Sequence, residues 1–236
     1  DLFLDHGLAT SALKFPILWG EEKFLPYEYG YLCFLYKEQE ISHPPKNFED
    51  MVNNPDIKLL IPNPYTSIPG FGLVLWLKDL QGSKASKTWR RLKPRIISIT
   101  KNWSQAYTLF QKGEGNVMLS YTNAALHLAH LGKKGFAVAL FEDGQYLQSS
   151  LIAVIKTSKH TTLGIKFLET MLDPQMQTII SKKTWMYPVT TSPQIKMLTD
   201  SYIHIETART IHPKVATMNR RTWVKEWRNA LSKSPA

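Results

Sequence analysis

Short apolar runs recur through the middle of this chain. They lie at 58–61, 96–99, 117–121 and 136–141. Runs of this length, rich in β-branched and other apolar residues, are typical of strands that are buried in a sheet. The intervals between them are long enough to hold helices. The pattern therefore predicts several strands separated by helices.

Helical patterns fill these intervals, and most of them have a capping residue at one end. They are a helix opened by the capping-box-like spacing of 47–50, an apolar helix at 72–80 closed by Gly82, a helix capped by Ser104 and closed at Gly113, and a helix at 123–131. Strands that alternate with helices are the signature of a layered α/β fold. The middle of the chain is thus expected to be a small α/β unit.

Two longer extended segments bracket this unit, at 29–36 and 146–155. Two such strands crossing between two sheets would form a hinge, with a ligand cleft between two lobes. After the second of them the chain is mainly helical, at 160–172, 174–181 and 217–233.

The expected division of the chain has two lobes. Residues 1–36 and 145–236 form lobe one with the hinge strands, and residues 37–144 form lobe two. The sheet that lobe one requires is barely represented after residue 145. We therefore expect lobe one to be incomplete, with its first strands and helices missing before Asp1.

The formal net charge of +10 over 236 residues raises the possibility of a nucleic-acid-binding module. The distribution of the charge favours solvated helix faces instead. The basic residues fall into two small groups with helical spacing, Lys87, Arg90, Arg91, Lys93 and Arg95, and Arg220, Arg221, Lys225 and Arg228. A basic nucleic-acid-binding module remains an alternative from a different class, and steep salt dependence of binding would distinguish it.

No sequence motif supports an enzyme or a metal site. The nucleophile elbow, the zinc-protease motif, the phosphate-binding loop and the paired-cysteine motif are all absent from the sequence. His127 and His130 form a pair on an expected helix, but a metal site needs three or four ligands, so a surface pair is favoured. Cys33, the single cysteine, lies in an apolar run and is expected to be buried.

The loop at 63–70 lies between a strand and an apolar helix. The backbone N–H groups at a helix N-terminus suit an anion such as a phosphate, and Thr66 and Ser67 would add hydroxyl donors. The alternative is that this loop only caps its own helix, which such loops often do.

Three aromatic residues lie at the edges of expected elements: Trp103, Tyr121 and Trp185. Ligands of open α/β sheets bind beyond the carboxyl ends of the strands, so aromatics there can form the wall of a site. Such a wall suits a flat cation, which gains about 0.5–2 kcal/mol per ring from cation–π attraction. Each aromatic taken singly is more typical of a core position than of a ligand wall, and only the joint placement of the three favours a site.

Seven segments of this chain are similar to the thiamine-binding periplasmic proteins. They follow in the family's order at nearly its spacing: FLPYEYGY at 24–31, NPYTSIPG at 63–70, WSQAY at 103–107, LSYT at 119–122, YLQ at 146–148, WMYPV at 185–189 and WVKEW at 223–227. The resemblance implies an α/β, two-lobed type II periplasmic binding-protein fold, with lobe one truncated at its N-terminus. It also implies the substrate-binding component of an ABC importer, which binds thiamine or its phosphates between the lobes.

Carried over to this chain, the resemblance places Trp103, Tyr121 and Trp185 against the thiamine rings and Ser67 near the phosphate or hydroxyethyl end. The family also has an aromatic pocket residue shortly after the segment at 119–122; in this chain either His127 or no residue takes that place, so ligand preference can differ. Because the front of lobe one is expected to be missing, we predict weak or no thiamine binding by this chain alone.

The resemblance further implies a monomeric carrier in the periplasm, without enzymatic activity, cofactor or nucleic acid, that delivers its ligand to an inner-membrane permease. The closest alternative keeps the fold and changes the solute to a polyamine or ferric iron. Iron carriers need oxygen or imidazole ligands converging on one point, which tryptophan does not offer.

Overall fold

The computed structural model describes residues 2–10, 13 and 22–232. Residues 1, 11–12 and 14–21, which fall within the expected first segment of lobe one, lie outside the described residues. The chain divides into two compact units. Unit 1 comprises Asp1–Gly30 and Ser149–Ile203, and unit 2 comprises Tyr31–Gln148 and His204–Ala236.

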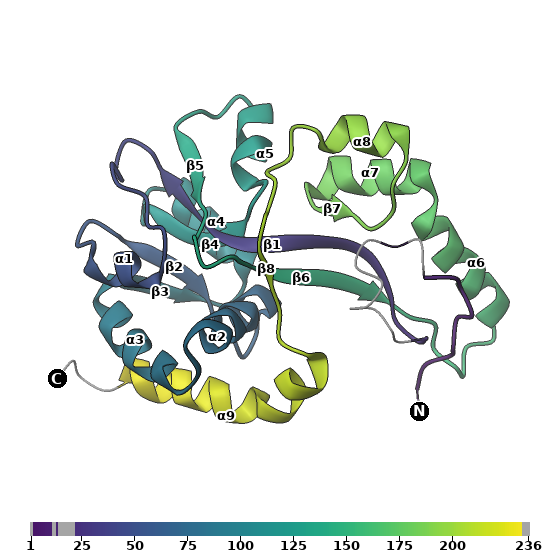
Figure 1. The fold of residues 1–236 in the computed structure, drawn as a ribbon, viewed down its shortest axis with the longest axis horizontal. Helices are drawn as coiled ribbons and strands as arrows, with labels where there is room; N and C mark the ends of the chain where they lie inside the picture. Colours follow the sequence, from purple (N-terminus) through teal and green to yellow (C-terminus); the bar gives the residue numbers. More distant parts are fainter. Residues whose placement is uncertain (1, 11–12, 14–21, 233–236) are drawn as a thin grey trace. The chain divides into compact units, whose positions relative to one another are not determined.

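The elements alternate between strand and helix through most of the chain (Figure 1). The strands are β1 (Leu25–Lys37), β2 (Leu59–Pro62), β3 (Ile96–Thr100), β4 (Val117–Tyr121), β5 (Phe136–Ala139), β6 (Gln145–Ile152), β7 (Tyr187–Pro188) and β8 (Ala208–Arg209). The α-helices are α1 (Phe48–Asn53), α2 (Ile68–Gln81), α3 (Ala85–Leu92), α4 (Trp103–Gln111), α5 (Ala124–His130), α6 (Thr161–Leu172), α7 (Pro174–Thr184), α8 (Pro193–Thr199) and α9 (Pro213–Ser232). The expected α/β alternation is confirmed.

The sheet of unit 2 has the order β3, β2, β4, β1. Strand β2 is parallel to both neighbours, with Leu60 opposite Ser98 of β3 and opposite Met118 of β4. Strand β1 runs antiparallel to β4 and also to β5. Because β2, β3 and β4 point the same way, their carboxyl ends lie at one edge of the sheet.

Helix α2 is buried through its middle, from Gly72 to Leu77. Ser67 caps its start, and Gly82 ends it at a φ of 54°, a left-handed value that glycine adopts without steric cost. The helix packs against β2, β4, α3 and α9. A helix that is apolar on nearly all sides is stable in water only when other elements cover it on every side.

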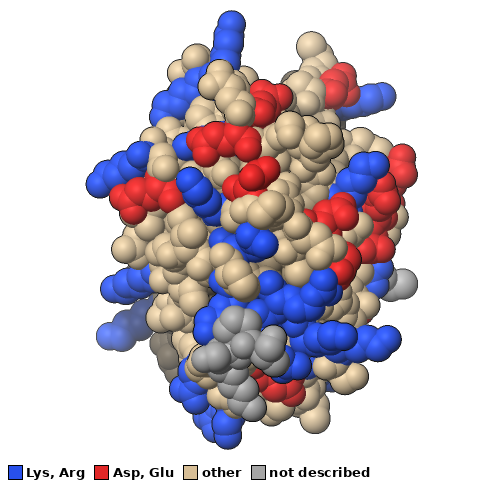
Figure 2. All heavy atoms as spheres, turned by 90° about the vertical axis from the view of Figure 1, so that its left-hand side faces the viewer, with Lys and Arg blue, Asp and Glu red and all other residues tan. Residues whose placement is uncertain are grey.

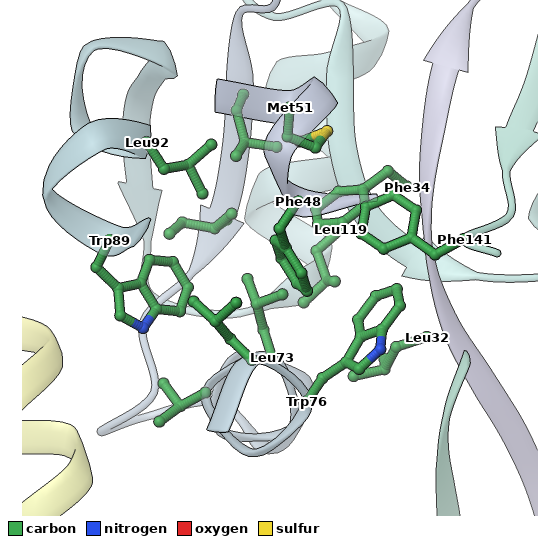
Figure 3. Packing of buried hydrophobic residues seen from close by; sticks show 14 of the residues in the cluster. Leu32, Phe34, Phe48, Met51, Leu73, Trp76, Trp89, Leu92, Leu119 and Phe141 are labelled. Carbon is green, nitrogen blue, oxygen red and sulfur yellow. The ribbon is translucent and has the colours of Figure 1, made fainter. Parts of the chain in front are cut away.

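The core of unit 2 is built around an aromatic cluster (Figure 3). Trp76 of α2 is fully buried, with its ring centroid 5.9 Å from that of Phe34 and 4.9 Å from that of Phe141. Cys33 is also fully buried, and burial raises the pKa of its thiol well above the ordinary range. Aromatic rings of this size contribute much of the apolar area that stabilises a domain.

Unit 1 contains α6, α7 and α8 together with β7, which pairs with the start of β1. Gln177 of α7 is fully buried and joins three segments. Its amide donates to the backbone carbonyls of Tyr27 and Met171, both at 2.7 Å, and accepts from the N–H of Val189 at 2.8 Å. The carboxamide thereby satisfies backbone groups that would otherwise be buried without a partner.

The boundary between the units differs from the expected division at the C-terminus. Residues 204–236 were expected in lobe one, but α9 packs on α2 and α3 of unit 2. The cause is its apolar face, on which Trp227 lies 6.4 Å from Trp89 of α3, ring centroid to ring centroid. The two bracketing strands, β1 and β6, do run through both units, with crossings after Gly30 and Gln148. Within the described ranges, no helix is both long and apolar enough to span a bilayer.

Candidate functional site

The loops that follow β2 and β3 are joined at the carboxyl edge of the unit 2 sheet. The N–H of Asn63 donates to the carbonyl of Thr100 at 2.8 Å, and the hydroxyl of Thr66 donates to the carbonyl of Lys101 at 2.6 Å. Both loops precede a helix, so the starts of α2 and α4 are held at the same edge. This is the edge at which ligands of open α/β sheets bind.

Ser67 lies at the N-terminus of α2 and is buried. Its Oγ accepts a hydrogen bond of 3.4 Å from the N–H of Gly70, so the residue is the N-cap of its own helix. A hydroxyl that accepts one bond still has a proton to donate. A Cβ on Gly70 would lie 2.4 Å from the carbonyl oxygen of Pro62, so only glycine lets the helix begin this close to β2. Capping is thus shown, whereas anion binding by Ser67 stays a prediction.

Trp103 is the first residue of α4, at the end of the loop after β3. The cap of this helix is Asn102, whose Oδ1 accepts from the N–H of Gln105 at 2.9 Å, so the prediction of Ser104 as the cap was wrong. The ring stacks on Tyr107, with centroids 5.1 Å apart and an interplanar angle of 14°. Among the described residues, its buried indole N–H has no acceptor. A buried donor without a protein partner can serve a ligand or a water molecule.

Tyr121 ends β4, where it lies opposite Leu32 of β1. Its hydroxyl donates to Oε1 of Gln148 at 2.7 Å, and Nε2 of Gln148 donates to the carbonyl of Ile68 at 3.3 Å. Tyr121 is thereby joined to the first residue of α2, next to Ser67. The sequence analysis gave Gln148 no role. Its only sequence signal was the family-like segment 146–148.

His127 lies on α5 after β4 and is half-buried. Burial, followed by the charges of His130 and Lys133, lowers its pKa below the ordinary value of 6.5. The imidazole is therefore neutral at pH 7. No group of three or more His, Cys, Asp or Glu side chains that could hold a metal ion occurs within residues 2–10, 13 and 22–232.

Trp185 belongs to unit 1, at the end of α7. Its backbone has a φ of 59°, a value that residues other than glycine rarely adopt, and its N–H donates to the carbonyl of Ser181 at 2.9 Å. The indole stacks on Tyr202, with centroids 6.1 Å apart. The turn thus directs a bulky aromatic away from the helix path, an arrangement that functional sites often retain at a cost in strain.

The five candidate residues therefore divide between the units. Ser67, Trp103 and Tyr121 lie at or just after the carboxyl ends of β2, β3 and β4, and His127 follows on the next helix. Tyr121 packs against the core cluster that contains Trp76, and Trp103 packs against the separate cluster that contains Phe110. Trp185 lies in unit 1. The unit 2 group offers flat aromatic faces, an indole donor and a helix N-terminus. These features suit a ligand that has an aromatic cation at one end and a polar or anionic group at the other.

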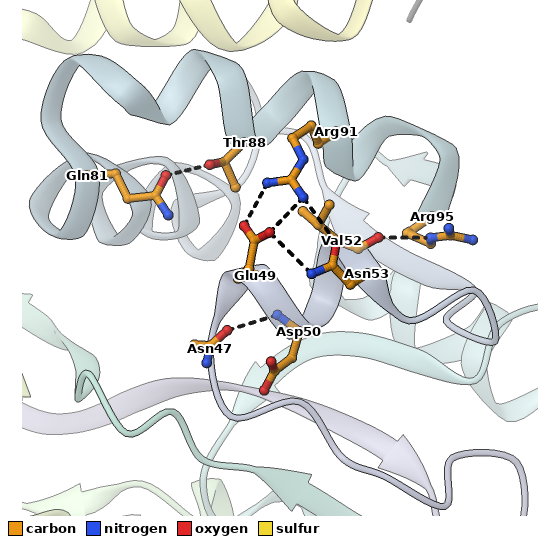
Figure 4. Close-up of polar contacts among 9 residues, drawn as sticks. All are labelled: Asn47, Glu49, Asp50, Val52, Asn53, Gln81, Thr88, Arg91 and Arg95. Atoms are coloured by element: carbon orange, nitrogen blue, oxygen red, sulfur yellow. Dashed lines mark hydrogen bonds and ion pairs between the residues drawn. The ribbon is translucent and has the colours of Figure 1, made fainter.

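Two residues of the first basic group, Arg91 and Arg95, hydrogen-bond to neighbouring parts of the fold (Figure 4). Arg91 donates two hydrogen bonds to the carboxylate of Glu49, at 2.6 and 2.7 Å, and Arg95 donates to the carbonyls of Val52 and Pro55. These bonds hold α3 and the segment after it against α1. Figure 2 shows that this face carries acidic side chains among the basic ones. The arrangement agrees with solvated, paired helix faces.

Comparison with known protein families gives one match that covers most of the chain. Residues 7–185 match the family described as bacterial extracellular solute-binding protein. A thiamine-binding periplasmic protein of Salmonella typhimurium is 35% identical over 234 residues, which is 98% of this chain and 71% of that protein. A thiamine-binding periplasmic protein of Escherichia coli is 35% identical over 237 residues, again 98% of this chain and 71% of that protein.

A solved structure is also similar along nearly the whole chain. It is described as a periplasmic thiamin binding protein, and it matches with a TM-score of 0.90 at 34% sequence identity. The match covers 98% of this chain and 73% of the other. Similarity of this extent covers both units and every candidate site residue.

Proposed function

This chain belongs to the bacterial extracellular solute-binding proteins, and within them to the thiamine-binding periplasmic proteins, and from that membership we propose that it is the substrate-binding component of an ABC importer for thiamine or its phosphates. The single observation that carries the proposal is the 35% identity over 98% of the chain with relatives of that name. The type II periplasmic binding-protein fold that the resemblance implied is confirmed.

The unit 2 site supports this ligand class on chemical grounds. Thiamine has two flat heteroaromatic rings, one of which carries a permanent positive charge. The indole of Trp103 and the phenol of Tyr121 can stack on such rings, and each favourable cation–π contact contributes about 0.5–2 kcal/mol. We propose that Trp185 of unit 1 contacts the same ligand, as the sequence resemblance implies.

The polar end of the ligand is assigned to the start of α2. The N-terminus of a helix of 14 residues carries a partial positive charge that suits phosphate oxygens. Ile68 supplies the first N–H, since Pro69 has none and the N–H of Gly70 donates to Oγ of Ser67. The hydroxyl of Ser67 can add a donor there. This arrangement favours thiamine phosphates over thiamine, and comparing the affinities of the three forms tests that preference.

The cellular setting is proposed from the relatives. They are named as periplasmic binding proteins, which supports a periplasmic carrier that delivers its ligand to a membrane permease and catalyses no reaction. We propose a monomer, and light scattering coupled to size-exclusion chromatography tests that point. The polyamine, ferric-iron and nucleic-acid alternatives are not favoured, since the relatives at this level of identity are all named for thiamine.

The test is a titration of the purified chain with thiamine, thiamine monophosphate and thiamine diphosphate. Calorimetry and tryptophan fluorescence measure the binding. Concentrations should reach the millimolar range, because weak or no binding by this chain alone is predicted. The expected result is saturable binding with quenching that involves Trp103 and Trp185. Because the chain has seven tryptophans, Trp103→Phe and Trp185→Phe are compared with Trp223→Phe on α9 as a matched control.

Phenylalanine keeps a smaller aromatic face that attracts a cation less strongly, so the two site variants should raise the dissociation constant several-fold, below the roughly 30-fold that complete loss of a contact of about 2 kcal/mol would give, and the control should leave it unchanged. Saturable binding of a polyamine or ferric iron, with no binding of any of the three compounds, would contradict the proposal, whereas a folded chain that binds no solute at all agrees with the predicted weak or absent binding by this chain alone. Equal weakening in all three variants would instead show that the quenching reports general destabilisation.

A further inference from the structure

One amide side chain connects three elements at the edge where the candidate ligand wall lies. Gln148 projects from β6. Its Oε1 accepts from the Tyr121 hydroxyl of β4 at 2.7 Å, and its Nε2 donates to the Ile68 carbonyl of α2 at 3.3 Å. Both polar ends of the carboxamide are therefore used, one by a candidate ligand-contacting ring and the other by the helix start beside Ser67.

The packing around Gly72 leaves room for this connection. A Cβ at Gly72 would lie 3.2 Å from Nε2 of Gln148 and 2.8 Å from Cδ1 of Leu32. Both distances are tighter than ordinary van der Waals contact, so a larger residue there would press on the amide. The absence of a side chain on this turn of α2 lets Gln148 reach past it to the Ile68 carbonyl.

The position of Gln148 along the chain adds a second feature. It is the last residue of unit 2, and Ser149, the next residue of β6, belongs to unit 1. The ring that is assigned to the ligand is thus hydrogen-bonded to the strand at the residue where that strand leaves unit 2.

We propose that Gln148 is a positioning residue that sets the orientation of Tyr121 and its distance from the start of α2, so that the aromatic and polar ends of one ligand are recognised together. The inference rests on the proposed thiamine-class function and deepens it. Without Gln148 the phenol hydroxyl would lose this hydrogen bond and its connection to the α2 start, and the ligand would lose affinity because the ring would be held less closely in the orientation for stacking. Gln148 acts through Tyr121 and the α2 start, without a contact to the ligand of its own.

The test measures thiamine affinity by calorimetry for the parent chain, Gln148→Leu, Tyr121→Phe and the double variant. Leucine keeps a similar volume without polar atoms, and phenylalanine keeps the ring without the hydroxyl. Since one hydrogen bond contributes about 0.5–1.5 kcal/mol, each single variant should raise the dissociation constant roughly three- to tenfold. The double variant should be weakened no more than the stronger single variant, because both changes break the same link.

A matched control comes from the same strand. Gln145 is buried in β6, and its Nε2 donates to the carbonyl of Phe141 at 3.0 Å, without a bond to Tyr121. Gln145→Leu, like Gln148→Leu, therefore removes a hydrogen bond that a glutamine of β6 donates to a backbone carbonyl. It should leave thiamine affinity within twofold of that of the parent chain. Thermal unfolding of each variant shows whether it is folded.

Four outcomes would overturn the inference, and only the last of them would also overturn the proposed function. An unchanged affinity in Gln148→Leu, or additive losses in the double variant, would overturn the role of Gln148 alone. Equal weakening by Gln145→Leu would assign the effect to general loosening of β6 and would also overturn that role. A folded parent chain that binds a polyamine or ferric iron and neither thiamine nor its phosphates would overturn the proposed function together with the role.

Discussion

The hydroxyl of Thr66 donates a hydrogen bond of 2.6 Å to the backbone carbonyl of Lys101, which joins the loop after β2 to the loop after β3. The two residues are 35 positions apart in the sequence. Ser67 follows one of them directly, and Trp103 follows the other by two positions. This bond therefore fixes the distance between the polar and aromatic parts of the candidate site.

Replacing Thr66 by valine removes this bond and keeps the shape of the side chain. We expect a loss of about 0.5–1.5 kcal/mol in the free energy of unfolding and a rise of a few fold in the dissociation constant for thiamine. Urea unfolding and calorimetry measure the two quantities. The control is Thr108→Val on α4, which removes a hydroxyl bond of 3.0 Å to the carbonyl of Ser104 within one helix. Equal effects of both substitutions on affinity would contradict a role for the loop connection.

His127 should make both stability and thiamine affinity depend on pH. Its pKa is lowered in the folded chain, first by burial and then by His130 and Lys133, so between that lowered pKa and about 6.5 the unfolded chain binds more protons. Stability must therefore rise with pH through this window and level off above it. Protonation also places a positive charge on the helix after β4, which should weaken binding of a cationic ligand at the acidic end.

The measurement is thermal unfolding and thiamine titration of the parent and His127→Gln between pH 5 and pH 8 (roughly the range in which histidine titrates). The substitution should flatten both profiles. Part of the stability slope should persist, because burial also lowers the pKa of His6 in unit 1. His43→Gln, an exposed position, serves as the control. A profile that is unchanged in His127→Gln would refute the assignment.

The pair of Arg91 and Glu49 should stabilise the chain only above the pKa of the carboxylate. The hydrogen bond from Arg91 is the largest cause that lowers the pKa of Glu49, so the stabilisation is fully present above the ordinary value and is lost as the pH falls through the lowered pKa. Both side chains are substantially exposed, so the effect at pH 7 should be small and should weaken in high salt.

Arg91→Gln should therefore lower the midpoint of thermal unfolding slightly at pH 7 and leave it equal to that of the parent once Glu49 is protonated. Arg90→Gln, the adjacent exposed arginine on α3, makes the same change in net charge and is the control. A difference from the parent that persists undiminished in strong acid would show that Arg91 stabilises the helix by packing instead of by its charge.

Local signals in the sequence were sufficient to predict most of the elements. Asn47 accepts from the N–H of Asp50 at the start of α1, and Gly82 ends α2, as the capping pattern indicated. The cap of α4 was misassigned because Asn102 and Ser104 are both good capping residues, and only the extended backbone of Asn102, with a φ of −153°, decides between them. The docking of α9 on unit 2 could not be predicted, since Trp89 and Trp227 meet only through tertiary packing.

The position of a candidate site residue could be predicted from the sequence where that residue lies at the end of a predicted strand. Trp103 follows β3 and Tyr121 is the last residue of β4, so the sheet alone places them at one edge. Gln148 could not be found in this way. It lies 27 positions from Tyr121 and 80 from Ile68, and no local pattern encodes bonds of that range. Such bonds depend on the strand order of the sheet, which the alternation of elements leaves undetermined.

Trp76 should be the most sensitive core position of unit 2. It is fully buried among aromatic rings, and its Nε1 donates to the carbonyl of Gly144 at 3.1 Å. Trp76→Phe keeps an aromatic ring but leaves this buried carbonyl without its donor, which should cost about 1–3 kcal/mol of unfolding free energy. Trp76→Ala adds a large cavity, and the expected loss is about 3–5 kcal/mol.

Urea unfolding followed by circular dichroism measures these losses. The control is Trp223→Phe on α9, a half-buried tryptophan that should cost less than about 1 kcal/mol because solvent already reaches its ring. Both effects act through stability, so thiamine affinity per folded molecule should be unchanged in Trp76→Phe. A loss of affinity without a loss of stability would contradict the placement of Trp76 in the core and would assign it to the ligand site instead.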